Sequence, residues 1–290
     1  MKVKSLVILA RPQQYVKNTF IFLPIFFGLQ ISNVPFLLNA LMAFIAFSFT
    51  ASSLYILNDY LDREEDRKHP IKKSRPIASG DVSAKSALIF MLVLFVLGMS
   101  LMVSLSLYAA LILASYAVMI IAYSFYFKHI AIIDVSIIAV GFVLRLFIGS
   151  AVTGIELSIW IVVMTYLLAL FLALAKRRDD VLIFQETGEK MRKNVDGYNL
   201  RFLDGVMTIM AAVVIVAYIL YTTSTEVVHR FGSEYLYLTA FFVVIGIMRY
   251  MQIAYVEKDS GSPTKVLLKD RFIQLAVIGW IATFSWILYL

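Results

Sequence analysis

The chain of 290 residues contains no cysteine, which excludes disulfide bonds, thiolate zinc sites and iron–sulfur clusters. Its three histidines are far apart and share no spacing typical of metal ligands. Charged residues make up only 16% of the chain, whereas hydrophobic residues make up 61%. Soluble globular proteins contain about 45–50% apolar residues, so the composition predicts a membrane protein.

Short segments of alternating polarity, which a transmembrane β-barrel requires, are also absent from the chain. What is present instead is a series of apolar runs, most of them close to the roughly 20 residues that cross a bilayer core as a helix. We therefore expect an all-α, polytopic membrane protein with one domain over residues 1–290 and nine transmembrane helices. The nine expected spans are about 15–30, 34–57, 84–105, 107–126, 132–153, 157–175, 202–221, 235–255 and 272–290.

The basic residues gather in blocks that alternate along the chain. They precede the first span and recur between spans two and three, six and seven, and eight and nine. By the positive-inside rule the N-terminus is cytoplasmic and the C-terminus lies outside. Termini on opposite sides of the membrane require an odd number of spans, and nine spans satisfy this. The two long polar segments, about 58–83 and 176–201, then face the cytoplasm. The net charge of +7 is thus explained by topology, with the lipid bilayer rather than nucleic acid as partner.

Five carboxylates lie in the segment LNDYLDREEDRKHP, directly after the second apolar run. If the helix continues past Leu57, then Asp59, Asp62 and Asp66 lie within about 60° of one another on one face. One interpretation is a solvated helix end in which neighbouring arginines pair with the acids. The other is a magnesium site, because carboxylate oxygens are the ligands that hard cations prefer. The spacing alone leaves both open.

The pattern Asn58-Asp59-x-x-Asp62-x-x-x-Asp66 resembles the NDxxDxxxD signature of the UbiA superfamily of intramembrane prenyltransferases. The resemblance covers essentially the whole chain. It implies a nine-helix bundle with a cytoplasm-facing active-site cavity, in which magnesium binds a diphosphate. It also implies that Asp59, Asp62 and Asp66 are the catalytic metal ligands and that Asn58 assists them.

Further stretches resemble the branch of this superfamily that contains the decaprenyl-phosphate phosphoribosyltransferases. They are RPQQYVKN at 11–18, DRKHPIKKSRPIASG at 66–80, GFVLR at 141–145 and LAKRRDD at 174–180, while YSFYFK at 123–128 is shared more broadly. Tyr15 stands where that branch usually has tryptophan. The second DxxxD motif of aromatic prenyltransferases is missing, and a tribasic run occupies its place.

The resemblance implies a magnesium-dependent enzyme of the plasma membrane. It would transfer 5-phosphoribose from phosphoribosyl diphosphate to a long-chain polyprenyl phosphate, release diphosphate, and invert ribose C1. In relatives the product supplies arabinose-type sugars for cell-envelope polymers. Two phosphorylated substrates need additional cations, and arginine suits bidentate phosphate contacts. The expected substrate-binding residues are Lys17, Asn58, Arg75, Tyr123, Lys128, Arg145, Lys176, Arg177 and Arg178.

Arg145 lies near the middle of the fifth span, where an arginine costs at least about 2.5 kcal/mol on insertion scales. It either faces a polar interior or extends toward the outer membrane surface. Asp134 could be its partner only in a distorted helix, because eleven helical residues separate the two by about 16 Å.

Two other functions stay open at this stage. One is a prenyltransferase of the same fold that moves a polyprenyl group from its diphosphate to an aromatic or quinone precursor. The other is a transporter or channel, which would explain the spans and Arg145 but not three aspartates beside a basic shell. The oligomeric state is likewise open, a homo-oligomer being one alternative.

Overall fold

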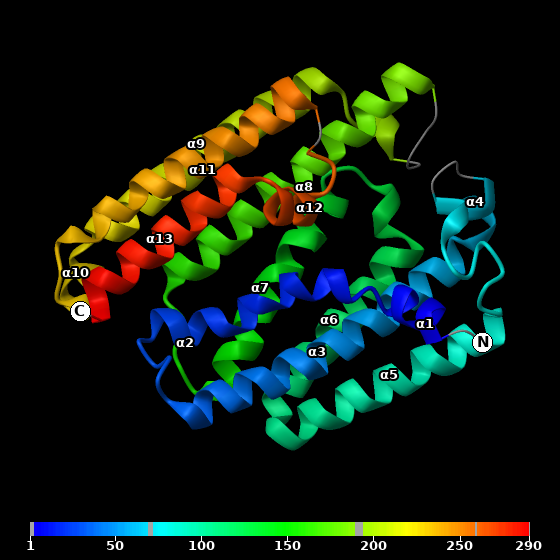
Figure 1. The fold of residues 1–290 in the computed structure, drawn as a ribbon, viewed down its shortest axis with the longest axis horizontal. Coiled ribbons are helices and arrows are strands. Elements are labelled where there is room, and N and C mark those ends of the chain that lie inside the picture. Colours follow the sequence, from blue (N-terminus) through cyan, green and yellow to red (C-terminus); the bar gives the residue numbers. More distant parts are fainter. Residues whose placement is uncertain (1–2, 69–71, 189–193, 259, 290) are drawn as a thin grey trace. The chain divides into compact units, whose positions relative to one another are not determined.

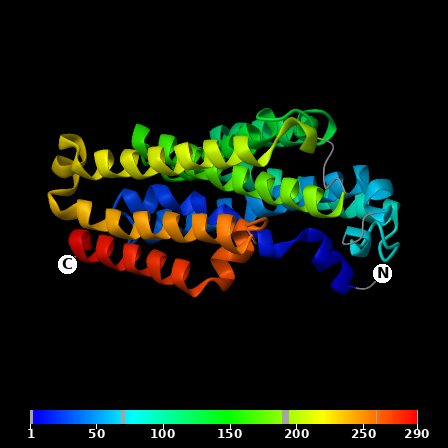
Figure 2. The same ribbon diagram turned by 90° about the horizontal axis from the view of Figure 1, so that it is seen from above.

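The computed structural model describes residues 3–68, 72–188, 194–258 and 260–289. Over these residues the chain is helical and contains no strand (Figures 1 and 2). Its contacts divide it into two compact units. Unit 1 comprises Met1–Lys128 and Val140–Leu157, and unit 2 comprises His129–Ala139 and Ser158–Leu290. The assignment of the whole chain to one domain stays a prediction.

Eight of the described helical segments are long and apolar enough to cross a membrane. This confirms the expected all-α, multi-pass membrane fold. The spans are Val34–Leu61, Ala84–Leu105, Leu107–Phe125, Ile133–Thr153, Ile159–Thr187, Leu200–Thr223, Tyr235–Glu257 and Arg271–Leu288. The expected count of nine is not confirmed by the described residues, because the segment at about 15–30 has a different structure.

That segment forms the 3₁₀ helix η1 (Pro12–Phe22) and the short helix α2 (Leu23–Phe27). A 3₁₀ helix of eleven residues is unusually long, since runs beyond three or four residues are uncommon. Side-chain hydrogen bonds hold it to the next helix, from Tyr15 to Ser52 and from Asn18 to Ser48. These bonds compensate for the poorer geometry of the backbone hydrogen bonds within η1.

Unit 1 is built around the central helix α3, against which η1, α5 and α6 pack. The other elements of the unit are short, apart from the second half of α7. The helices and turns are α1 (Val3–Ala10), η1, α2, α3 (Val34–Leu61), α4 (Arg63–Lys68), η2 (Lys72–Ser74), α5 (Ala84–Leu105), α6 (Leu107–Phe125), η3 (Phe127–His129) and α7 (Ile133–Thr153).

Small side chains on α3 allow its neighbours to approach closely, as is common between membrane helices. Ala40, Ala43 and Ala46 are completely buried. Facing them, Gly98 of α5 leaves so little space that an added Cβ would lie 2.6 Å from the carbonyl oxygen of Ala46. The α3–α5 contact therefore depends on glycine, and it supports the helix whose end carries the acidic motif.

In unit 2 the long helices α8 and α9 pack against each other, as do α11 and α13 (Figure 2). The first turn of α7 joins the same apolar core through Val135. The elements of this unit that follow α7 are α8 (Ile159–Thr187), η4 (Val195–Gly197), α9 (Leu200–Thr223), α10 (Thr225–Phe231), η5 (Tyr235–Thr239), α11 (Ala240–Gln252), the π-helix η6 (Ile253–Glu257), α12 (Pro263–Lys269) and α13 (Arg271–Tyr289).

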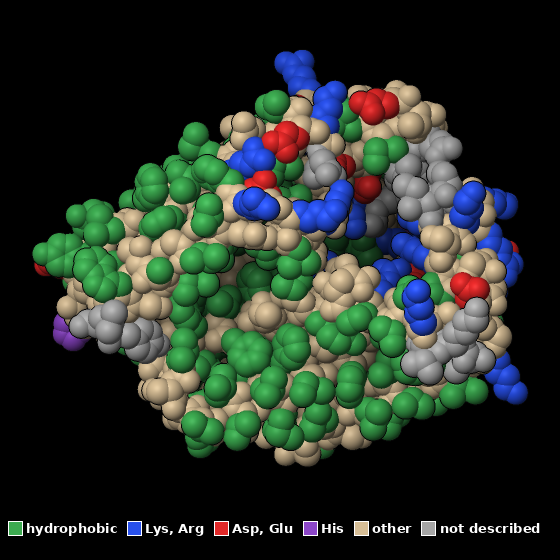
Figure 3. Space-filling model, viewed as in Figure 1, with side chains coloured by type: hydrophobic (Ala, Val, Ile, Leu, Met, Phe, Trp, Pro, Cys, Tyr) green, Lys and Arg blue, Asp and Glu red, His purple; other side chains and the backbone are tan. Residues whose placement is uncertain are grey.

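The surface of unit 2 reflects its membrane environment. Hydrophobic side chains cover most of α13, whereas charged side chains gather around α12 and the start of α13 (Figure 3). Helix α8 continues to Thr187, well past the expected end of the sixth span near residue 175. The reason is that the charged side chains in its last three turns find partners, as described below.

Substitution of Gly98 by alanine tests the close contact between α3 and α5. The added methyl group overlaps the hydroxyl of the buried Thr50 and the backbone carbonyl oxygen of Ala46, so we expect a loss of about 1–3 kcal/mol in stability. The measurement is the thermal midpoint in detergent. Gly205→Ala in α9 is the control, because a Cβ there has no neighbour within 4 Å. Equal effects of the two substitutions would contradict the close-packing account.

Candidate active site

The acidic motif lies where α3 ends and α4 begins in unit 1. Helix α3 extends to Leu61, so Asn58 and Asp59 occupy its last turn, and Asp62 is its C-terminal cap. Asp66 follows on α4. Asp59 and Asp66 are almost completely buried, at 2% and 3% exposure. Carboxylates so removed from water require compensating charge or hydrogen bonds.

Basic side chains from three other segments supply this compensation. Arg75 donates from one nitrogen, Nη1, to Asp59 at 3.0 Å and to Asp66 at 2.7 Å. Lys128 pairs with Oδ1 of Asp62 at 2.5 Å, while Asn58 donates to its other oxygen at 3.0 Å. The predicted residues Asn58, Asp59, Asp62, Asp66, Arg75 and Lys128 are thus brought together.

Arg11 is the residue of this cluster that sequence reasoning did not assign to the site. Its Nη2 donates to Asp59 Oδ1 at 2.5 Å, and its guanidinium lies 5.4 Å from the ring centroid of Tyr55. The backbone of Arg11 is left-handed, with φ 53° and ψ 55°, which is costly for a residue other than glycine. The only available signal was its position at the start of RPQQYVKN.

The carboxylates of the motif provide part of what a magnesium site requires. Asp59 and Asp66 both pair with a single cationic nitrogen of Arg75. The two carboxylates therefore face one position, which is occupied by a cation. Magnesium is usually held by one or two carboxylates plus water and substrate phosphates, and this pair fits that requirement. No group of three potential ligands close enough to hold a metal occurs among the described residues. Asp62 instead faces Lys128.

The electrostatics of Asp66 reflect two opposing effects. Burial raises the pKa of its carboxyl above the ordinary value, and the neighbouring charge of Asp59 adds to this. The charge and hydrogen bond of Arg75 act in the opposite direction. Because burial is the larger effect, the ionised form of Asp66 depends on a nearby cation.

Arg145 lies in the interior of unit 1, with 4% exposure, and does not extend to the outer surface. It donates to Asn18 Oδ1 at 2.9 Å and to the carbonyl oxygen of Gly141 at 2.5 Å. Its guanidinium lies 4.5 Å from the ring centroid of Phe47. Its side chain therefore joins η1 to α7 and α3. The neighbour of Asn18, Lys17, is half-buried.

Asp134 is not the partner of Arg145. It is completely buried in unit 2, where Arg177 donates to its Oδ2 at 2.6 Å. Asn194 donates to the same oxygen at 2.9 Å and Tyr198 donates to Oδ1 at 2.6 Å. Burial and this bond to Asp134 raise the pKa of Tyr198, which keeps its hydroxyl a neutral donor.

The next two residues of α8 each contact a different neighbour. Arg178 donates to Asp204 of α9 at 2.6 Å and to the carbonyl oxygen of Ala254 in the π-helix at 2.6 Å. Asp179 accepts a hydrogen bond from Ser260 at 2.7 Å. Arg177, Arg178 and Asp179, which we call the α8 clamp, therefore join α8 to α7, to α9 and to the segment after η6.

The two remaining predicted residues are Tyr123 and Lys176. Tyr123 is half-buried near the end of α6 in unit 1. Lys176 is half-buried on α8 in unit 2, immediately before the α8 clamp.

Comparison with known proteins identifies the family of this chain. The model of the UbiA prenyltransferase family matches residues 21–278, nearly the whole chain. This chain belongs to the UbiA prenyltransferase family. The membership of the UbiA superfamily that the sequence led us to expect is thereby confirmed.

Curated relatives of this UbiA family member cover most of its length. The decaprenyl-phosphate phosphoribosyltransferase of Corynebacterium glutamicum is 32% identical over 276 residues, which are 93% of this chain and 82% of that protein. The protein of the same name from Mycolicibacterium smegmatis is 30% identical, over 99% of this chain and 93% of that protein.

Solved structures agree with the UbiA fold. A UbiA homolog from Archaeoglobus fulgidus, bound to GPP and Mg²⁺, aligns with a TM-score of 0.72 at 18% identity. The alignment covers 99% of this chain and 100% of that one. A digeranylgeranylglyceryl phosphate synthase structure aligns with a TM-score of 0.64, also at 18% identity. At this identity the similarity establishes the fold alone.

The buried pair between Asp134 and Arg177 generates a prediction. In Asp134→Ala the guanidinium of Arg177 stays buried and loses its principal carboxylate, so we expect a loss of about 3–5 kcal/mol in stability. Thermal unfolding in detergent measures it. Glu64→Ala is the control, since its pair with Arg67 is exposed and contributes at most about 1 kcal/mol. An Asp134→Ala protein as stable as Glu64→Ala would contradict the assignment.

Proposed function

We propose that this UbiA family member transfers 5-phosphoribose from phosphoribosyl diphosphate to a long-chain polyprenyl phosphate. The full-length similarity to relatives named decaprenyl-phosphate phosphoribosyltransferase carries the proposal. The arrangement of the site supports it, because each aspartate of the motif is paired with a cation able to bind phosphate instead.

The three basic partners have a second role in this proposal. A diphosphate at the motif competes with Asp59, Asp62 and Asp66 for Arg11, Arg75 and Lys128, since phosphate oxygens are strong acceptors for charged donors. As these cations move to phosphate, the carboxylates become available as metal ligands. Asp59 and Asp66 would hold Mg²⁺, with Asp62 and Asn58 assisting. When bound, the ion would neutralise the negative charge of the departing diphosphate.

The reaction itself requires little from the protein beyond position and charge. The bond between ribose C1 and the diphosphate oxygen breaks, and diphosphate leaves with the electron pair. C1 gains oxocarbenium character, and a phosphate oxygen of the lipid forms the new bond from the opposite face, which inverts C1. That oxygen is already anionic, so no general base is needed.

The remaining cations divide into two groups. We propose Lys17, Arg145 and Lys176, together with Tyr123, as further substrate-binding residues. We assign Arg177 and Arg178 to the α8 clamp rather than to phosphate, because both guanidinium groups are paired with carboxylates and are also buried, at 1% and 6% exposure, whereas Arg11, Arg75 and Lys128 are partly exposed. The site and the N-terminus would face the cytoplasm of a plasma membrane, with the C-terminus outside. The product would serve as a sugar donor for envelope polymers.

The proposal is tested with purified protein, Mg²⁺, phosphoribosyl diphosphate and a long-chain polyprenyl phosphate. We expect lipid-linked phosphoribose by mass spectrometry, lost on addition of EDTA and restored by excess Mg²⁺. Prenylation of 4-hydroxybenzoate from polyprenyl diphosphate, with no phosphoribosyl product, would identify the other enzyme of this fold. No metal-dependent release of diphosphate from either donor would indicate a transporter.

Asp62→Asn separates the catalytic role of the motif from its structural role. We expect turnover to fall by roughly 100-fold or more, while the thermal midpoint stays close to that of the wild type. Asp81→Asn is the matched control, because Asp81 is exposed and lies outside the motif. Wild-type turnover in Asp62→Asn would refute the assignment of the motif.

A further inference from the structure

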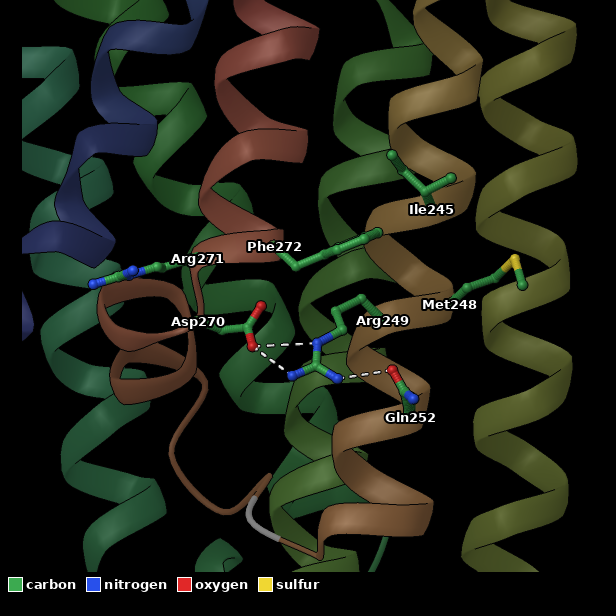
Figure 4. Close-up of a pocket in the computed structure, with 7 residues that line it drawn as sticks. All are labelled: Ile245, Met248, Arg249, Gln252, Asp270, Arg271 and Phe272. Atoms are coloured by element: carbon green, nitrogen blue, oxygen red, sulfur yellow. Dashed lines mark hydrogen bonds and ion pairs between the residues drawn. The ribbon is translucent and has the colours of Figure 1, made fainter.

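Unit 2 has an open groove of about 640 Å³ between α11 and the start of α13 (Figure 4). Its lining residues include none of the acidic motif, and the proposed reaction makes no use of it. The residues that line it are Ile245, Met248, Arg249, Gln252, Asp270, Arg271 and Phe272.

The packing of the two helices explains where the groove forms. Along their length α11 and α13 approach closely through small residues, since a Cβ on Gly246 would contact Ala276 at 3.8 Å. One turn further along α13, Gly279 packs against the ring of Phe242. Toward the start of α13 the facing residues are large, and Phe272 extends toward α11 (Figure 4). The groove opens at that end.

The floor of the groove is a closed polar network. Arg249 donates to Asp270 Oδ2 from both Nε, at 3.2 Å, and Nη2, at 2.7 Å. Its Nη1 donates to Gln252 and to Glu257, each at 2.7 Å. The hydrogen bonds from Arg249 hold the pKa of Asp270 below its ordinary value. Two carboxylates thus face the single cation Arg249, so the floor carries one net negative charge.

Two cations lie at the edge of this floor, and we call them the rim: Arg271, which lines the groove, and Lys269, which immediately precedes the lining residue Asp270 in the chain. Lys269 and Arg271 flank Asp270 and are exposed. Neither forms an ion pair with another described residue. Arg271 points away from Arg249 (Figure 4). Two cations without ion pairs to described residues therefore lie beside a groove whose floor carries one net negative charge.

The walls of the groove are apolar and exposed. Met248 is 62% exposed and Phe272 is 49% exposed. In a multi-pass membrane protein such side chains at the ends of spanning helices contact lipid. An apolar wall below a cationic rim is complementary to a lipid whose headgroup is anionic and whose chain is hydrocarbon.

We propose that this groove binds an anionic phospholipid. The phosphate lies against Lys269 and Arg271, and an acyl chain lies along Ile245, Met248 and Phe272. The lipid is a bound structural partner of unit 2, distinct from the polyprenyl phosphate of the proposed reaction. The assignment does not depend on that reaction.

Native mass spectrometry of the detergent-purified protein tests this proposal, with phosphatidylglycerol and phosphatidylcholine of identical chains as probes. We expect one phosphatidylglycerol to bind more tightly than phosphatidylcholine. In the double variant Lys269→Gln/Arg271→Gln the affinity for phosphatidylglycerol should fall by roughly 30-fold, to the level of phosphatidylcholine. Glycerol phosphate, which lacks acyl chains, should not compete.

The matched control is Lys85→Gln/Arg201→Gln, which removes two exposed cations elsewhere on the chain. It should keep the preference for phosphatidylglycerol. Phe272→Ala, which shortens the wall without changing charge, should weaken both phospholipids. Equal affinity of the wild type for the two lipids would overturn the proposal. So would an equal loss in the control variant, or competition by glycerol phosphate.

Discussion

The feature on which the site depends is the pairing of buried carboxylates at the end of α3 with cations from distant segments. Asp59 and Asp66 are almost completely buried, and Arg75 reaches both carboxylates through one nitrogen. Lys128 adds to the cluster from η3, and Arg11 adds to it from the position before η1. The pairing holds three segments of unit 1, around Arg11, Arg75 and Lys128, to one helix end. In the proposed reaction these cations exchange carboxylate for phosphate when the diphosphate binds.

The same principle organises the polar end of α8 in unit 2. Arg177, Arg178 and Asp179 are consecutive, so their side chains point in directions about 100° apart and contact three different elements. Because these charges are satisfied, the helix continues beyond the apolar run without exposing unpaired groups. Two of the three basic residues at 176–178, Arg177 and Arg178, thus have partners inside unit 2. Sequence similarity alone does not distinguish such a packing role from phosphate binding.

The sequence predicted the all-α membrane fold and eight of the helices because an apolar run of about 20 residues has few alternatives in a bilayer. It also placed the acidic motif at a helix end. It did not predict the 3₁₀ conformation of η1, which depends on Tyr15 and Asn18 bonding to serines of α3. Nor did it predict the partners of the acids, since Arg11 and Lys128 are 48 and 66 residues away from theirs in the chain. Pairings of that range depend on tertiary packing, and no local spacing records them.

The affinity for phosphoribosyl diphosphate tests most directly whether these cations exchange carboxylate for phosphate. We would measure its dissociation constant by calorimetry, with and without Mg²⁺, for wild type, Arg75→Gln and Arg67→Gln. Arg67 pairs with Glu64 on the exposed side of the motif and serves as the matched arginine. The account predicts that Arg75→Gln weakens binding by roughly 10-fold or more, as expected for the loss of a charge-assisted contact, while Arg67→Gln leaves it unchanged. Equal affinities for all three proteins would contradict it.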